Sequence, residues 1–246
     1  RKQKETYQLR TKKLRERNKE QNFQQMKLVW SPETAANAFV STVKSCNPTK
    51  DSSVAELVSA MAAGFKAKLI VETWSKGGAI LTSIGLAVAR QHAGGRHVCI
   101  VPDEETKREY LGSMEDYGRA CEVKIGEPEE AMNDLLGIEF LVVDSNRSDF
   151  FRVLSVANLS QQGAVVVLKN ADSVRLSGFG WRAVAEERSR RLVRSVFLPV
   201  GKGLDIAHVS SSATGAAVAN GAAGRGGRWI KHVDKATGEL ILIRKH

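Results

Sequence analysis

The chain has 246 residues, of which 42% are hydrophobic and 26% are charged. This composition is typical of one soluble globular domain, or at most two small ones. The longest apolar stretch, Gly77 to Ala89, is interrupted by Thr82 and Ser83 and is too short to span a bilayer, and no signal-peptide pattern precedes it. We therefore expect no membrane association. The formal charge of +10 points to nucleic acid or an anionic surface as a partner.

The three cysteines, Cys46, Cys99 and Cys121, are an odd number and include no CxxC pair. This pattern argues against a disulfide framework and against a zinc ribbon. It fits a reducing compartment, so we expect the protein in the cytoplasm or the nucleus.

The positive charge is concentrated in residues 1–25, which carry nine basic and three acidic side chains, a net charge of +6. The other 221 residues carry a net charge of +4. Large apolar residues are almost absent from residues 1–25, so this segment cannot offset its ordering entropy by burial. We expect a disordered or solvated extension that binds no specific nucleic acid, and Met26 as the native start of the protein.

Two helices are predicted at the start of the folded part. Ser31-Pro32-Glu33 supplies an N-cap, a proline in the first turn and an early acid, which opens a helix that extends to about Cys46. After Asn47-Pro48, a second helix begins at Asp51 or Ser52, because apolar residues recur there at helical spacing.

Short runs rich in β-branched residues then alternate with helical stretches. The runs are 68–72, 97–101, 121–125, 140–144 and 164–168, and the helical stretches are 77–92, 104–117, 128–136 and 148–159. The runs are apolar at consecutive positions, which is typical of strands buried on both faces of a parallel sheet. Repeated strand–helix units predict a doubly wound α/β domain.

The pattern changes after Asn170. Residues 181–191 favour a short basic helix, and the strands 193–198 and 204–209 flank a hairpin signal at Pro199–Gly203, which adds an antiparallel edge. We expect the domain to cover residues 26–209 and a flexible Ser/Ala/Gly-rich loop to cover 210–227. A C-terminal hairpin, with strands 229–233 and 239–243, is expected to pack on the same domain as residues 228–246.

Acidic residues stand at the carboxyl ends of four predicted strands, the edge at which open α/β sheets bind ligands. They are Glu72, Asp103, Glu127 and Asp144. Each of them could simply cap a turn or a helix. Together they favour a nucleoside-like ligand. The adjacent glycines Gly77 and Gly78 would let the protein backbone come close to that ligand and would leave N–H groups free at the start of a helix.

These features resemble the class I S-adenosylmethionine-dependent methyltransferases, specifically their catechol and caffeoyl-CoA O-methyltransferase branch. The resemblance covers about residues 54–209. It rests on Glu72–Gly78, on Phe140–Asp144 with Arg147, on Gly163–Val167 and on Leu198–Leu204. Residues 26–33, 67–74 and 228–233 are also similar to a plant family of unknown function that is known only as methyltransferase-like.

The resemblance implies S-adenosylmethionine as a cofactor. It places Glu72 and Gly78 at the amino-acid and ribose portions, Asp103 at the ribose, Gly126 and Glu127 at the adenine, and Asp144 beside the methyl donor.

Two residues depart from the pattern of the methyltransferase family. Trp74 replaces the first glycine of the first motif, and its bulk could fill the place of the amino-acid portion. Lys169 stands where the cation-dependent branch has its second aspartate, and an ammonium there would compete with a metal ion. We therefore expect no metal.

No other catalytic pattern stands out. The five histidines have no metal-ligand spacing, and the chain has no GxSxG motif. Lys169 could act as a general base if its pKa were lowered, but an ion pair with Asp144 is the favoured interpretation. No catalytic residue is assigned.

The leading functional hypothesis is a methyltransferase that acts on a small-molecule acceptor. The alternative is an inactive protein of the same fold that serves as a ligand-binding or interaction module. A third and weaker interpretation is an RNA-associated protein that uses Arg188, Arg190, Arg191 and Arg194 together with the basic segment 1–25. The sequence gives neither the acceptor nor the oligomeric state.

Overall fold

The computed structural model describes residues 29–46, 52–118, 121–182, 184, 190–211, 229–233 and 240–244. The predicted extension at residues 1–25 and most of the predicted loop at 210–227 lie outside these ranges. Among the described residues, no helix combines the length and the hydropathy needed to cross a bilayer.

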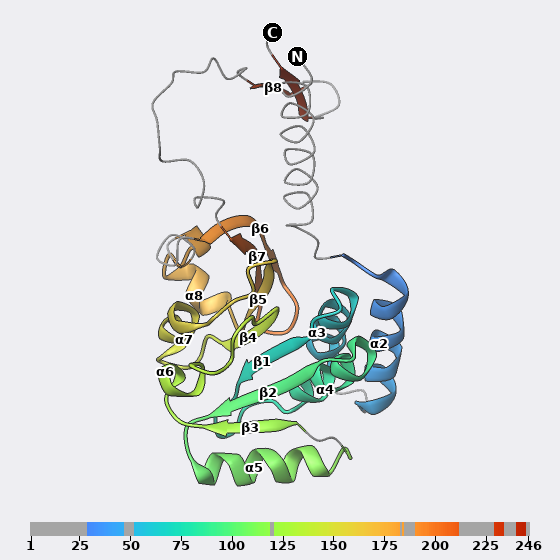
Figure 1. Cartoon of the computed structure of the whole chain (residues 1–246), viewed down its shortest axis with the longest axis vertical. Coiled ribbons are helices and arrows are strands. Elements are labelled where there is room, and N and C mark those ends of the chain that lie inside the picture. The colour runs from blue at the N-terminus through green and yellow to red at the C-terminus, as the bar shows by residue number, and fades with distance from the viewer. Residues whose placement is uncertain are drawn as a thin grey trace, which may run out of the picture. The chain divides into compact units, whose positions relative to one another are not determined.

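A seven-stranded sheet forms the centre of the first unit, with strand order β3-β2-β1-β4-β5-β7-β6 (Figure 1). The first five strands are parallel, and β7 runs antiparallel to β5 and β6. The strands are β1 (Leu69–Thr73), β2 (Arg96–Val101), β3 (Glu122–Ile125), β4 (Phe140–Asp144), β5 (Ala164–Lys169), β6 (Arg190–Leu198) and β7 (Leu204–Ser211). The predicted α/β class, the mostly parallel sheet and its antiparallel edge are confirmed.

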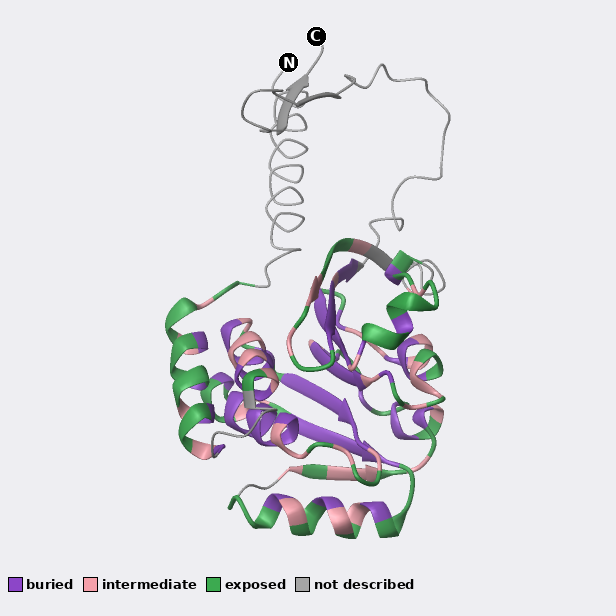
Figure 2. Cartoon of the chain, turned by 180° about the vertical axis from the view of Figure 1, so that it is seen from behind, coloured by how far each residue is buried: buried purple, intermediate pink, exposed green. Residues whose placement is uncertain are grey.

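Helices cover both faces of this sheet. The helices on one face are α2 (Pro32–Ser45), α3 (Ser52–Gly64), α4 (Leu81–Ala93) and α5 (Glu104–Glu115). Those on the other are α6 (Pro128–Ala131), α7 (Phe150–Val156) and α8 (Asp172–Leu176). The central strands are buried on both sides, as the consecutive apolar residues require (Figure 2).

Three predicted helix boundaries were wrong. Helix α4 begins at Leu81 rather than Gly77, because Gly77 has a left-handed backbone and belongs to the preceding turn. Helix α6 ends at Ala131 rather than near 136. The predicted basic helix at 181–191 does not reach its end, because Arg190 and Arg191 pair with Ser211 and Ser210 in the sheet.

A second unit contains β8 (Trp229–Val233) and β9 (Leu240–Arg244), which pair antiparallel. The predicted C-terminal hairpin is therefore present. Its packing on the first unit stays a prediction.

Candidate functional site

A pocket of about 370 Å³ opens at the carboxyl edge of β1, β4 and β5. The strand order reverses between β1 and β4, and this switch point is where open α/β sheets bind their ligands. The lining residues come from α3, the turn before α4, the ends of β4 and β5, and the β6–β7 turn: Val54, Gly77, Gly78, Ala79, Leu81, Thr82, Asp144, Asn146, Lys169, Asn170 and Val200–Leu204. The volume lies in the range of small-molecule sites.

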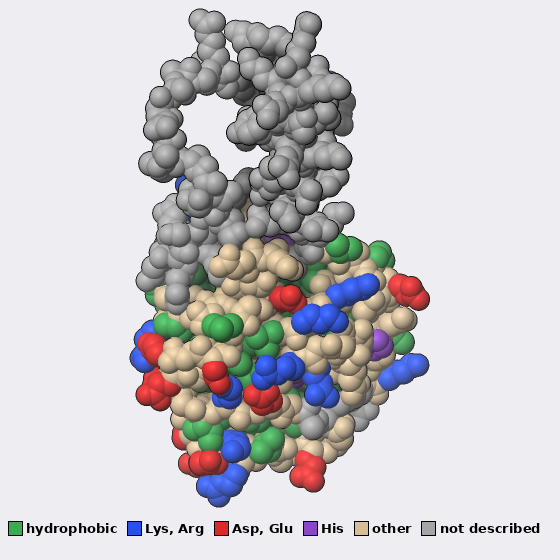
Figure 3. Space-filling model, in the orientation of Figure 1, with side chains coloured by type: hydrophobic (Ala, Val, Ile, Leu, Met, Phe, Trp, Pro, Cys, Tyr) green, Lys and Arg blue, Asp and Glu red, His purple; other side chains and the backbone are tan. Residues whose placement is uncertain are grey.

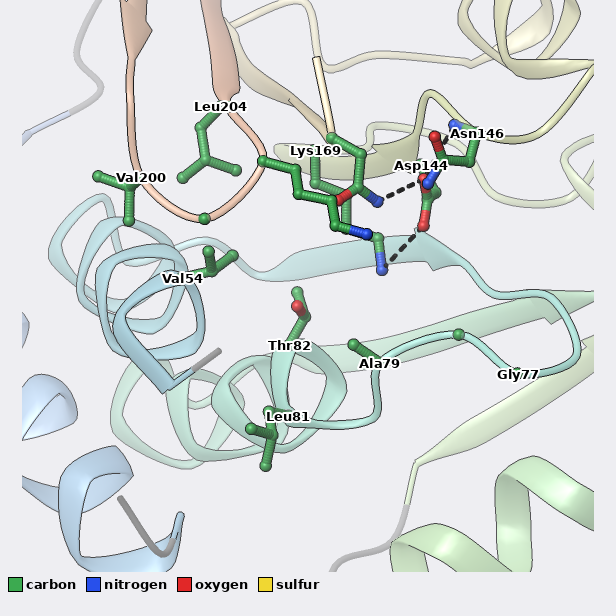
Figure 4. Close-up of a pocket in the computed structure, with 15 residues that line it drawn as sticks. Val54, Gly77, Ala79, Leu81, Thr82, Asp144, Asn146, Lys169, Val200 and Leu204 are labelled. Atoms are coloured by element: carbon green, nitrogen blue, oxygen red, sulfur yellow. Dashed lines mark hydrogen bonds and ion pairs between the residues drawn. The ribbon is translucent and has the colours of Figure 1, made fainter. Parts of the chain in front are cut away.

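The polar end of the pocket is built around Asp144 (Figure 4). Its Oδ1 accepts a hydrogen bond from Asn170 Nδ2 at 2.8 Å and one from the Asn146 backbone N–H at 3.0 Å. Its Oδ2 lies 3.4 Å from Lys169 Nζ. Asn170 has a left-handed backbone with φ of 58°, which turns the chain where β5 ends. The predicted ion pair between Lys169 and Asp144 is therefore present.

The turn after β1 lines the pocket, but the N–H groups of its two glycines are already bonded within the protein. The Gly78 N–H donates to the Ser75 carbonyl at 2.9 Å, and the Gly77 N–H donates to Glu109 Oε1 at 3.0 Å. The expectation that these two N–H groups would be free was wrong, because the turn and α5 satisfy them.

The Trp74 side chain is buried and packs against this turn. A Cβ on Gly78 would lie 2.9 Å from both Trp74 Nε1 and the Ser75 carbonyl oxygen, so no larger residue fits there unless the indole and the backbone of the turn both move. The ring also meets Tyr110 edge-on, with centroids 5.3 Å apart. Two buried polar atoms at this strand end, Thr73 Oγ1 and Trp74 Nε1, have no hydrogen-bond partner among the described residues. Neither residue is among those that line the pocket, so the two unpaired atoms are a desolvation cost within the core.

Glu72 does not line the pocket. It lies on the sheet face covered by α4 and α5, is 1% exposed, and accepts hydrogen bonds from His97 Nε2 at 3.0 Å and from Tyr110 OH at 2.9 Å. Burial acts to raise the pKa of Glu72, but the hydrogen bond and charge of His97, together with Lys169, hold this pKa below its ordinary value. The carboxylate is thus a buried negative charge behind the pocket wall.

Asp103 caps helix α5. Its Oδ1 accepts from the Thr106 N–H at 2.7 Å, and this hydrogen bond is the main cause of the lowered pKa of Asp103. The side chain stays exposed.

Gly126 and Glu127 follow β3. Gly126 has φ of 132°, and the exposed Glu127 forms an ion pair with Arg152 at 3.1 Å. Of the six predicted cofactor residues, the structure brings Gly78 and Asp144 together in the pocket. Glu72, Asp103, Gly126 and Glu127 lie outside its lining.

The β6–β7 turn supplies pocket residues that the sequence did not assign. Lys169 pairs with Leu204, so the turn before Leu204 stands at the carboxyl edge of β5. The sequence contained the turn signal at Pro199–Gly203, but not the pairing of β7 with β5 that brings Val200 and Lys202 to the site.

Other chemistry has little support in the described part of the chain. No group of three His, Cys, Asp or Glu side chains there could hold a metal ion. The three cysteines form no disulfide, and burial raises the pKa of the Cys121 thiol to about 12. On the face drawn in Figure 3, basic and acidic side chains are interspersed rather than gathered into one basic patch.

Residues 26–245 match the family described as "Protein of unknown function (DUF1442)". No curated protein matches the chain. Among solved structures, the O-methyltransferase TomG from Streptomyces achromogenes, in complex with S-adenosylmethionine, is 20% identical. It superposes with a TM-score of 0.51 over 71% of this chain and 90% of its own. An O-methyltransferase from Bacillus cereus, in complex with S-adenosylhomocysteine, is 16% identical. Its TM-score is 0.50 over 74% of this chain and 93% of its own. The fold is therefore a Rossmann-like methyltransferase fold.

Proposed function

The chain belongs to the DUF1442 family, and on this premise we propose that it is a methyltransferase that uses S-adenosylmethionine and a small-molecule acceptor. The observation that carries the proposal is the pocket at the strand-order switch, where Asp144 stands beside the turn that contains Gly78. Fold alone does not fix function, so the argument depends on this site.

The charges around the pocket suit a cationic cofactor. Glu72 and Asp144 supply two carboxylates near the pocket. The Lys169 ammonium interacts with both, because it forms an ion pair with Asp144 and its charge helps to lower the pKa of Glu72. With Lys202, which also lines the pocket, the four charges sum to zero. A positively charged sulfonium would therefore be stabilised by its closeness to the Asp144 carboxylate and not by a net negative charge.

The cofactor residues follow from these positions. We assign Gly78 and Asp144 to direct contact, because both line the pocket. Glu72 would act through its charge from within the protein, because it is covered. Asp103, Gly126 and Glu127 are assigned to the ribose and the adenine, at the ends of the neighbouring strands β2 and β3.

Methyl transfer needs few catalytic side chains, because alignment of the acceptor with the donor supplies much of the rate. When bound, S-adenosylmethionine supplies an activated methyl group. The chain's own contribution is to orient the acceptor and exclude water. Val54, Val200 and Leu204 form an apolar wall suited to hold the body of an acceptor.

We further propose that the reaction does not use a divalent metal ion. The Lys169 ammonium lies 3.4 Å from Asp144 Oδ2 and is 5% exposed, so a positive charge already occupies the side of the carboxylate that a metal ion would need. Two cations in that space would repel each other.

The direct test is turnover. The full chain is incubated with S-adenosylmethionine and a panel of phenols, catechols and hydroxy acids, and release of S-adenosylhomocysteine is followed by mass spectrometry. Acceptor-dependent release that persists in EDTA supports the proposal, and Asp144→Asn should reduce it. Cofactor binding without release for any acceptor would favour the alternative of an inactive binding module, which the buried Trp74 against Gly78 would explain.

A further inference from the structure

The acidic and basic side chains of the pocket differ in how many of their hydrogen-bonding positions are free to bind a ligand. The Asp144 carboxylate already faces three donors, from Asn170, Asn146 and Lys169. Its Oδ1 is already held by two donors, so a ligand donor is left mainly with Oδ2, which it would share with Lys169.

The two lysines of the pocket have unused donors. An ammonium group has three N–H donors, and within the described residues Lys169 forms one ion pair, with Asp144 at 3.4 Å. Lys169 is 5% exposed and still lines the pocket, so its remaining donors face the protein interior or the cavity. Lys202 lines the pocket from the β6–β7 turn, and no described carboxylate lies within ion-pair distance of it.

The opposite end of the pocket is apolar. Val54, Val200 and Leu204 lie together at one end, and Asp144 and Asn146 lie at the other (Figure 4). A ligand that matches both ends has an apolar body and a group that accepts hydrogen bonds. Since the available donors are positively charged, an anionic group on the ligand would form the strongest hydrogen bonds with them.

We propose that the methyl acceptor carries a carboxylate or another anionic oxygen group, and that Lys169 and Lys202 bind this group. That the ligand is a methyl acceptor rests on the proposed function. Binding of an anion at the two lysines does not, and it can be tested without turnover. The same chemistry could serve the carboxylate of S-adenosylmethionine instead, so the experiment has to separate the two sources.

The test is calorimetric titration of the full chain with matched pairs of probes. Benzoate, 4-hydroxybenzoate and 3,4-dihydroxybenzoate are each compared with the corresponding amide, with and without S-adenosylhomocysteine. We expect at least one acid to bind about tenfold more tightly than its amide, because charge-assisted hydrogen bonds are stronger than neutral ones. Added salt should reduce this preference.

Lys202→Met is the informative variant, because Lys202 is exposed and its loss should not impair folding. We expect it to reduce the preference for the acid to within about threefold. Lys44→Met is the matched control, since Lys44 is an exposed lysine on α2 outside the pocket, and it should leave the preference unchanged.

Equal affinity for every acid and its amide, or no binding of any acid, would overturn the proposal. Weaker binding of S-adenosylhomocysteine to Lys202→Met, with unchanged binding of 5′-methylthioadenosine and of the acids, would assign the lysines to the cofactor carboxylate and would also overturn it. Binding of S-adenosylhomocysteine without a preference for acids leaves the proposed function intact. A preference for acids without cofactor binding refutes the proposed function but leaves the anion site.

Discussion

Lys169 Nζ lies 3.4 Å from Asp144 Oδ2, so the ends of two adjacent parallel strands are joined by an ion pair in the wall of the pocket. The Asn170 amide holds the other carboxylate oxygen. This arrangement gives the site a fixed internal cation and keeps the Asp144 carboxylate in one orientation.

Replacement of that cation should create a metal site. In Lys169→Asp, two carboxylates would stand together beside Asn170, whose amide now donates to Asp144 and would turn its oxygen toward a bound cation. Hard divalent cations prefer such oxygen ligands. We expect Mn²⁺ to raise the thermal unfolding midpoint of this variant in a concentration-dependent way and to leave the wild-type midpoint unchanged. The double variant Lys169→Asp with Asp144→Asn is the control. If Mn²⁺ does not change the thermal unfolding midpoint of Lys169→Asp, the Lys169 ammonium does not stand where a metal ion could bind.

Removal of the Trp74 indole should open the turn after β1. Trp74→Gly is expected to tighten binding of S-adenosylhomocysteine about tenfold, because the ring packs against Gly78 beside the pocket. It should also lower the free energy of unfolding by about 3–5 kcal/mol, since a buried aromatic ring is lost. Both quantities can be measured by calorimetry and urea denaturation.

Trp181→Phe is the control for that variant, because Trp181 is buried in the core on the other face of the sheet. It should destabilise the protein without a change in affinity. Unchanged or weaker ligand binding by Trp74→Gly would mean that the indole does not obstruct the cofactor.

The buried Glu72 should contribute to stability in a pH-dependent way. The pKa of Glu72 in the folded protein is lowered from its ordinary value of 4.5, so the stabilisation is present above that pH and is lost as the pH falls through the folded pKa. Glu72→Gln should cost about 3 kcal/mol at neutral pH, because it removes the buried carboxylate that accepts hydrogen bonds from His97 and Tyr110. It should also flatten the decline of stability in acid.

Urea denaturation between about pH 3 and pH 7 measures this effect. Glu122→Gln provides the comparison, because Glu122 forms an exposed ion pair with Arg96 and should cost at most about 1 kcal/mol. An equal slope of stability against pH in Glu72→Gln and wild type would contradict the assignment.

Two glycines test the packing that positions the pocket helices. A Cβ at Gly85 would lie 2.5 Å from the Ala55 carbonyl oxygen, so α4 and α3 cross in close contact there. Gly85→Ala should therefore destabilise the protein by about 1–3 kcal/mol. Gly112, in α5, has nothing within 4 Å of such an atom, so Gly112→Ala should stabilise by about 0.5–1 kcal/mol. Thermal unfolding of the two variants should shift in opposite directions, and a shared direction would contradict the close crossing.

The strands were predictable because their signal is local. Phe140–Asp144 and the run at 164–168 are consecutive apolar residues, and the structure places β4 and β5 there to within a residue. The start of β6 at Arg190 was missed because the strand continues past a register shift between Leu192 and Arg194, where Arg190 and Arg191 are held by pairing with the far end of β7.

The site was less predictable than the fold for a similar reason. An acid at a strand end can face the crevice, as Asp144 does, or the interior, as Glu72 does. The choice depends on which helix covers that face, here α5 through Tyr110. The sequence does not contain this information in any local pattern, and the same holds for Lys202, which reaches the pocket through strand pairing.

The most direct test of the account is calorimetric titration of S-adenosylhomocysteine into the full chain, alongside Asp144→Asn, which keeps the shape of the side chain and removes its charge. The account predicts saturable binding of one ligand per chain to the wild type and clearly weaker binding to the variant. Absence of binding to the wild type at millimolar ligand would contradict it.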